Sequence, residues 1–190
     1  GGQGNLFFGK VLAQVAFLAG YDDRNILKGE THGMAQMGGP VISTFGCGEV
    51  FSPALVPGTA NVLIAMEKAE VLRPGFLDLL EPGGTVLMAD TRILPHGLKP
   101  EAYPSDEAIA AQLEGYRVVS VDVLSIALNL GDPKGRCANV AMLGVLSTLP
   151  PFDVVPEAVW LQALRGISRK PALWDLNHAA FMAGRGMQKG

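Results

Sequence analysis

Residues 60 to 89 limit the possible fold more than any other part of this sequence. The run "ANVLIAM" is continuously apolar, which is typical of a strand that is buried on both faces. The stretch "EKAEVLRPGFLDLL" follows with a helical pattern, and "EPGGTVLMA" is a second strand. Because a strand, a helix and a strand in this order form a β-α-β unit, the sequence predicts a pair of parallel strands.

The segments on either side of this unit add one strand and several helices. Apolar residues recur at helical spacing from residue 5 to residue 20. The stretch "RVVSVDV" predicts another strand, and Ser105 is expected to cap a short helix before it. Further helices are predicted at 123–130, 139–147, 156–165 and 172–183, and residues 184–190 are expected to fray. We therefore predict an α/β fold with an open, mostly parallel sheet and helices on both faces, a Rossmann-like arrangement of three layers.

The segment between the first helix and residue 60 is less regular. The stretch "RNILKGETHGMAQMGGP" has several glycines and no sustained period, so we expect an ordered loop with one helical turn around Thr31 to Met37. The stretches "PVISTFGCG" and "EVFSP" alternate about the turn "GCGE". This pattern predicts a small antiparallel hairpin that joins Val41–Phe45 to Val50–Ser52.

Length and composition favour a single domain, residues 1–190, that works with partner chains. Hydrophobic residues make up 48% of the 190, charged residues only 17%, and the mean hydropathy is +0.27. This is apolar for a soluble monomer and indicates a surface that is covered in a hetero-oligomer. The formal net charge of -3, without a cluster of Lys and Arg, disfavours nucleic acid and anionic membranes as partners. The apolar stretches are too short to span a bilayer and no signal peptide is visible, so a cytoplasmic location is expected.

The sequence lacks the patterns of an active site that is complete within one chain, so we predict no catalytic residue and no metal site. Cys47 and Cys137 are far apart and outside any C-x-x-C motif, which indicates reduced thiols and not an iron-sulfur or zinc site. No serine lies in a G-x-S-x-G motif. Glu67 follows an apolar strand, where parallel sheets display functional groups, but we favour a role as the cap of the next helix. His96 and His178 are expected to be structural.

The turn before the first helix is a candidate for contact with an anion or a cofactor. Its glycines allow a close approach of the backbone, and the free N–H groups of the helix start attract phosphate or carboxylate. The alternative role is tight packing of the helix on a sheet, which we favour because neither a phosphate-binding loop nor a dinucleotide fingerprint is complete. The candidate residues are Gly1, Gly2, Gln3, Gly4 and Asn5.

The polar segment "KGETHGMAQMGGP" is a second candidate, for contact with the active site or with a partner subunit. Flexible Met side chains suit a surface that packs against another chain. Glu30 and His32 could act together as acid and base or share a metal, but no third ligand is nearby, so an interface loop is the favoured interpretation. The candidate residues are Glu30, Thr31, His32, Gly33, Met34, Gln36, Gly38 and Gly39.

Six stretches, taken together, resemble those of a known family in their order and spacing. They are "GGQGNLFFGKVLAQVAFLAGY", "ETHGMAQMGGPVIS", "ANVLIAMEKAEVLR", "EPGGTVLMAD", "YPSDEAI" and "NVAMLGVLS". The family is the gamma subunit, or gamma domain, of 2-oxoacid:ferredoxin oxidoreductases, and the small (beta) subunit of indolepyruvate ferredoxin oxidoreductase is the closest likeness. The resemblance runs from Gly1 to about Ala183 and implies a single gamma-type domain, whose usual opening strand is missing before residue 1.

The resemblance implies a subunit of an enzyme that converts a 2-oxoacid and coenzyme A into an acyl-CoA and carbon dioxide. Electrons pass to ferredoxin or a related acceptor, while larger partner subunits hold thiamine diphosphate, magnesium and the iron-sulfur clusters. The family often has Arg where this chain has Met37, and the change removes a bidentate partner for phosphate or carboxylate. Two alternatives are a free-standing nucleotide-binding domain and an assembly scaffold that contacts no cofactor.

Overall fold

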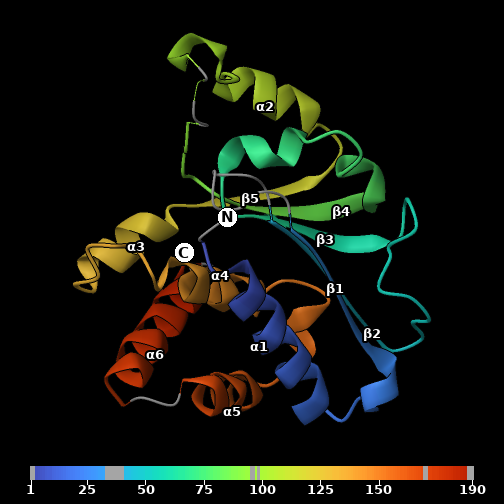
Figure 1. Cartoon of the computed structure of the whole chain (residues 1–190), viewed down its shortest axis with the longest axis vertical. Helices are drawn as coiled ribbons and strands as arrows, with labels where there is room; N and C mark the ends of the chain where they lie inside the picture. The colour runs from blue at the N-terminus through green and yellow to red at the C-terminus, as the bar shows by residue number, and fades with distance from the viewer. Residues whose placement is uncertain (1–2, 33–40, 95–96, 98, 169–170, 188–190) are drawn as a thin grey trace. The chain divides into compact units, whose positions relative to one another are not determined.

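The computed structural model describes residues 3–32, 41–94, 97, 99–168 and 171–187 of the chain (Figure 1). The chain divides into two compact units. The larger unit combines Gly1–Ala54 with Leu124–Gly190, and the smaller unit is the continuous segment Leu55–Val123. In the described residues, no helix has the length and apolar character needed to cross a membrane.

The smaller unit contains a three-stranded parallel sheet. Its strands are β3 (Ala60–Ala65), β4 (Leu80–Ala89) and β5 (Arg117–Val121), with β4 in the middle and parallel to both neighbours. The predicted β-α-β arrangement of parallel strands is therefore confirmed. Residues 85–89 of β4 are all buried, as the continuous apolar run of this strand requires.

The connection between β3 and β4 is not the helix that the sequence pattern predicted. Two short 3-10 helices replace it, η3 (Lys68–Leu72) and η4 (Leu77–Leu79). Pro74 is the physical reason, because a proline lacks the backbone N–H and forces the residue before it out of the helical region. Arg73 accordingly has extended backbone angles, φ -61° and ψ 130°.

Helix α2 (Asp106–Gln112) completes the core of the smaller unit. Ser105 caps it as predicted, since its hydroxyl oxygen accepts a hydrogen bond from the Ala108 N–H at 3.2 Å. Ile109 of α2 and Leu113 join a buried cluster with the strands and η3. The other members of the cluster are Ala65, Val71, Leu80, Val86 and Met88.

In the larger unit, strands β1 (Ile26–His32) and β2 (Val41–Cys47) form an antiparallel pair, against which helix α1 (Asn5–Leu18) packs. Two expectations were wrong here. Residues 26–32 are a strand and not a loop, and β2 pairs with β1 and not with residues 50–52. Of the helical turn expected around Thr31 to Met37, only Thr31 and His32 are described, and both lie in this strand. The register from Ile26–Cys47 to His32–Val41 pairs seven residues on each strand, many more than the predicted three-residue strand could offer.

Four helices complete the larger unit, at the places that the sequence pattern predicted. They are α3 (Val123–Asn129), α4 (Ala138–Leu146), α5 (Glu157–Ile167) and α6 (Pro171–Gly186). Trp160 of α5 is fully buried, with its ring 6.1 Å from that of Phe152 and 6.0 Å from that of Phe181. Short 3-10 helices also lie at η1 (Asp23–Asn25), η5 (Pro100–Ala102) and η6 (Phe152–Val154).

Helices α4 and α6 pack closely through two glycines. A Cβ added to Gly144 would lie 2.1 Å from the Phe181 carbonyl oxygen, and one added to Gly184 would lie 2.0 Å from the Ala141 carbonyl oxygen. Gly184 was expected to begin a frayed tail, but this contact keeps it within α6, which ends at Gly186. Together, the two units confirm an α/β fold with a parallel sheet flanked by helices and a small antiparallel pair.

Candidate functional site

The N-terminus of α1 is the described part of the first candidate site. Gly4 is the N-cap residue and has φ 77° and ψ 27°, a left-handed conformation that favours glycine. As a glycine, Gly4 has no side chain that could accept a capping hydrogen bond from this helix start. Its first backbone N–H groups therefore keep the capacity to bind an anion. Gly1 and Gly2 lie outside the described residues.

Asn5 links this helix start to the polar segment. Its Nδ2 donates a hydrogen bond to the Val41 carbonyl oxygen at 2.6 Å. Val41 begins β2 and pairs with His32, the last residue of β1. The structure thus places Asn5 of the first candidate segment beside Val41, the residue opposite His32 of the second one. The remaining candidates of the polar segment, Gly33, Met34, Gln36, Gly38 and Gly39, lie outside the described residues.

Glu30 and Thr31 are positioned by β1, opposite Ser43 and Ile42 of β2. The Glu30 carboxylate forms an ion pair with Lys28, so a positive charge lies beside it. An open cavity of about 260 Å³ lies over this strand pair. It is lined by residues 29–31 of β1, by Ile42 and Thr44 of β2, and by Pro53 and Ala54.

Asn139 is a further polar residue at the helix start, and the sequence analysis did not single it out. It lies in the first turn of α4, is only 6% exposed, and its Nδ2 donates to the Gly4 carbonyl oxygen at 3.3 Å. Helices α1 and α4 lie side by side in the larger unit (Figure 1). The available signal was that Asn139 is the one polar side chain in the apolar stretch "ANVAMLGVL".

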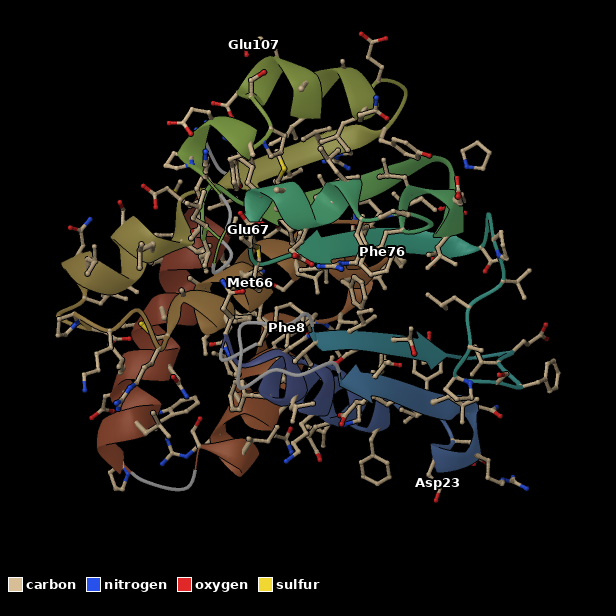
Figure 2. The ribbon with its side chains drawn as sticks, turned by 45° about the horizontal axis from the view of Figure 1, so that its top comes forward. Phe8, Asp23, Met66, Glu67, Phe76 and Glu107 are labelled. Carbon is tan, nitrogen blue, oxygen red and sulfur yellow. The ribbon has the colours of Figure 1, made fainter. Side chains whose placement is uncertain are left out.

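A second polar cluster lies at the carboxyl ends of β3 and β4 in the smaller unit. Glu67, at the start of η3 (Figure 2), is only 7% exposed. Its Oε2 accepts from the Glu70 N–H at 3.1 Å, which confirms the predicted capping role. Its Oε1 accepts from the Ile93 N–H at 3.2 Å and from the Tyr103 hydroxyl. Burial and this carboxylate raise the pKa of Tyr103, so its phenol stays protonated at neutral pH.

Charges in the same cluster compensate one another. The Lys68 Nζ lies 2.6 Å from the Asp90 carboxylate and 2.8 Å from that of Asp106, which also pairs with Arg92 at 2.5 Å. Hydrogen bonds with these two aspartates raise the pKa of Lys68, and the bond from Lys68 lowers the pKa of Asp106. Lys68 and Arg92 thus face the Asp90 and Asp106 carboxylates and hold the strand ends together.

The two cysteines are free thiols with little nucleophilic character. Burial raises the pKa of Cys47, and burial together with the nearby Asp132 carboxylate raises the pKa of Cys137 to about 11. In residues 3–32, 41–94, 97, 99–168 and 171–187, no group of three or more His, Cys, Asp or Glu side chains could hold a metal ion. His178 packs on the Trp174 ring in α6, and His96 lies outside the described residues.

Comparison with known proteins identifies the family. The sequence pattern that defines the family "Pyruvate ferredoxin/flavodoxin oxidoreductase" matches residues 1–187. The chain belongs to this family. It is 34% identical over 150 residues to indolepyruvate oxidoreductase subunit IorB of Archaeoglobus fulgidus, covering 77% of this chain and 71% of the relative. It is 30% identical over 190 residues to IorB of Methanothermobacter thermautotrophicus, covering 98% of this chain and 92% of the relative.

Three further proteins are similar to this chain, and two of them are much longer than it. Ketoisovalerate oxidoreductase subunit VorA of Methanothermobacter marburgensis is 31% identical over 97% of this chain, which spans 34% of that relative. A 2-oxoglutarate:ferredoxin oxidoreductase of Magnetococcus marinus has the same fold, with a TM-score of 0.69 and 18% identity over all of this chain and 29% of its own. The gamma subunit of a keto/oxoacid ferredoxin oxidoreductase of Geobacter sulfurreducens matches with a TM-score of 0.62 and 20% identity, over 97% of this chain and 90% of its own. The chain is thus homologous to the small subunit of 2-oxoacid:ferredoxin oxidoreductases.

Proposed function

We propose that this chain is the small subunit of a thiamine diphosphate-dependent 2-oxoacid oxidoreductase of the indolepyruvate or arylpyruvate type. One observation carries the proposal, which is the similarity to an IorB subunit over 98% of this chain and 92% of that subunit. The complete enzyme oxidatively decarboxylates the 2-oxoacid to an acyl-CoA and carbon dioxide. It passes the electrons to ferredoxin or a related acceptor, and the complex is a cytoplasmic hetero-oligomer.

The larger partner subunits hold thiamine diphosphate, magnesium and the iron-sulfur clusters in this proposal. The sequence of this chain has only two cysteines, far apart, and no C-x-x-C motif, so it offers no ligand set for a cluster of its own. We therefore assign the redox chemistry to the partners. The role of this chain is to bind and orient, and none of its residues is assigned a catalytic step.

Coenzyme A is the cofactor that the residues of this chain fit. A phosphate suits the N-terminus of α1, because the uncapped N–H groups and the helix dipole both favour an anion there. Gly4 has the left-handed conformation that starts this helix, φ 77° and ψ 27°. We propose that Gly1, Gly2, Gln3, Gly4 and Asn5 contact the phosphates, and that Asn5 is held in place by its bond to Val41.

The polar segment is the second part of this proposal. Glu30, Thr31 and His32 lie at the end of β1, and Asn5 bonds to the residue that pairs with His32. We propose that this end of the strand pair, with Gly33, Met34, Gln36, Gly38 and Gly39, contacts a larger subunit near the active site. Alanine substitutions at Glu30, His32 and Gln36 should then change turnover or the affinity for coenzyme A in the intact complex.

The test of the enzyme class is co-purification with a larger subunit that binds thiamine diphosphate and iron-sulfur clusters. The complex should reduce ferredoxin, or a viologen dye in its place, only when indolepyruvate or another arylpyruvate and coenzyme A are both present. A chain that stays a stable monomer and binds a nucleotide tightly by itself would support the free-standing domain instead. Unchanged turnover and coenzyme A affinity in the alanine variants would support an assembly scaffold.

The test of the phosphate contact is Gly4→Ala in the complex, with Gly20→Ala as the matched control. Both glycines have positive φ, 77° and 95°, so both substitutions impose similar backbone strain. Gly20 lies beyond the opposite end of α1, and a Cβ there meets no other described atom within 4 Å. We expect the KM for coenzyme A to rise in Gly4→Ala and to stay unchanged in Gly20→Ala.

A further inference from the structure

We propose that Asn139 is a positioning residue for coenzyme A binding, because it holds the Gly4 turn in the conformation that presents the N–H groups of α1 to a phosphate. The inference rests on the proposed function, which puts the cofactor phosphates at this turn. It adds a residue from α4, a helix that neither candidate segment includes.

The carboxamide of Asn139 lies directly against Gly4. A Cβ added to Gly4 would lie 2.1 Å from the Asn139 Nδ2 and 3.2 Å from its Cγ. The carboxamide therefore occupies the space in which any other residue at position 4 would put its side chain. Nδ2 donates to the Gly4 carbonyl oxygen, so the turn is held from one side by a residue that is 135 positions away in the sequence.

The hydrogen bond from Asn139 to Gly4 is not needed to satisfy the Gly4 carbonyl oxygen. The Gly4 carbonyl oxygen already accepts the first α-helical hydrogen bond, from the Phe8 N–H at 3.0 Å. If Asn139 were apolar, this carbonyl would still have a partner. The eight other residues of α4 are apolar or glycine and are all buried, which shows that the surroundings accept apolar side chains.

Asn139 also lowers the stability of the fold. Its Oδ1 is buried and has no hydrogen-bond partner in the described part of the chain. A buried acceptor without a donor destabilises a folded protein, because the acceptor loses its hydrogen bond to water. Turning the carboxamide over would not help, because an oxygen would then face the Gly4 carbonyl oxygen. A residue that lowers stability and yet fixes one turn is better explained by the ligand that the turn binds than by the fold.

The neutral charge of Asn139 fits the same role. An aspartate would occupy the same volume, but it would replace the donor to Gly4 by an oxygen and put a negative charge beside the anion. A leucine would keep the approximate volume, remove the unpaired oxygen and release the turn. The two substitutions therefore separate the contribution to ligand binding from the contribution to stability.

The experiment compares intact complexes that contain the unchanged chain, Asn139→Leu or Asn139→Asp. Calorimetry gives the dissociation constant for coenzyme A, and KM, kcat and the thermal midpoint are measured on the same complexes. Inorganic pyrophosphate serves as a competing probe. We expect the dissociation constant and KM to rise by about tenfold in Asn139→Asp and by a smaller factor in Asn139→Leu, with kcat nearly unchanged. The thermal midpoint of Asn139→Leu should equal or exceed that of the unchanged protein.

Asn177→Asp is the matched control. Asn177 is also buried, at 4% exposed, and its Nδ2 donates to the Ser168 hydroxyl oxygen at 2.7 Å, a bond that joins α6 to the end of α5 and involves neither Gly4 nor Asn139. Asn177→Asp should lower the thermal midpoint and leave the affinity for coenzyme A unchanged. If Gly4→Ala weakens coenzyme A binding but both Asn139 variants bind it normally, this inference is overturned and the proposed phosphate contact stands. If Gly4→Ala also binds it normally, both are overturned.

Discussion

One methyl group added at Gly184 tests the contact between α4 and α6. A Cβ at this position would lie 2.0 Å from the Ala141 carbonyl oxygen and 2.8 Å from the carbonyl carbon. Both atoms belong to the backbone of α4, so no side-chain rotation can make room and the two helices would have to separate. Because α4 is buried along its whole length, this separation would loosen the apolar contacts around it.

We expect Gly184→Ala to lower the free energy of unfolding by about 1 to 3 kcal/mol, the usual range for overpacking a core. This is a net effect, because alanine favours a helix over glycine by about 1 kcal/mol. Gly186→Ala is the matched control, since Gly186 lies two residues further along α6 and a Cβ there meets no other described atom within 4 Å. Gly186→Ala should leave the stability unchanged or raise it by up to about 1 kcal/mol.

The assay is a urea titration of the purified complex in which a short protease pulse digests only unfolded chains. The small-subunit band that survives at each urea concentration gives the midpoint. Equal midpoints for the two variants would refute the close helix contact. Gly144→Ala overpacks the same contact, at 2.1 Å from the Phe181 carbonyl oxygen, so the double variant should lose less stability than the sum of the single ones.

Substitutions at three further positions can be followed with the same titration. Ser105→Ala removes the cap of α2 and should lower the free energy of unfolding by about 1 kcal/mol, whereas Ser105→Asp should retain most of it. Tyr103→Phe removes the hydroxyl that donates to Glu67 and accepts from the Ala69 N–H, at a cost of about 1 to 3 kcal/mol; an unchanged midpoint would contradict the account of this cluster. The pKa of Cys137 is raised from 9.0 to about 11, so the folded chain keeps the thiol proton that the unfolded chain loses first. Stability should therefore be complete below about pH 9 and should decline as the pH rises towards 11, and Cys137→Ala should remove this decline.

The parallel strands could be predicted because each is marked by an apolar run within its own short segment of the sequence. The apolar run of β4 is buried from residue 85 to residue 89, as expected for a covered parallel strand, whereas in β3 only Ala65 is buried, so the prediction that β3 is buried on both faces was wrong. The apolar spacing of the connection between β3 and β4 predicts a helix, but this connection also contains Pro74. Pro74 overrides the spacing, since the backbone N–H and the helical angles that a continuous helix needs are both lost there.

Strand β1 was missed because its residues show no alternation that marks one buried face. Lys28 and Glu30 pair with each other on the strand, and Gly29 has no side chain, so the pattern resembles that of a loop. The pairing with β2 is decided by seven opposing residues and by the packing of α1 on the pair. None of these contacts is visible in a local window of the sequence.

The two halves of the candidate site differ in how far the sequence could predict them. A glycine before an apolar helix is a local signal, and Gly4 indeed adopts the left-handed N-cap conformation. The bond from Asn5 to Val41 and the support from Asn139 are tertiary contacts, across 36 and 135 positions of the chain. Their existence follows from the packing of α1 on β2 and α4, which no short-range pattern encodes.

The long separation between Gly4 and Asn139 has a consequence for biosynthesis. The larger unit is made from both ends of the chain, and the smaller unit, Leu55–Val123, is inserted between them. During translation the smaller unit leaves the ribosome as one continuous segment and can close its own core first. Residues 1–54 emerge earlier but must wait for α4 before the turn at Gly4 is supported. Residues 1–54 are thus among the last to reach their final environment, and a chaperone or the partner subunit could bind the exposed apolar face of α1 during that interval.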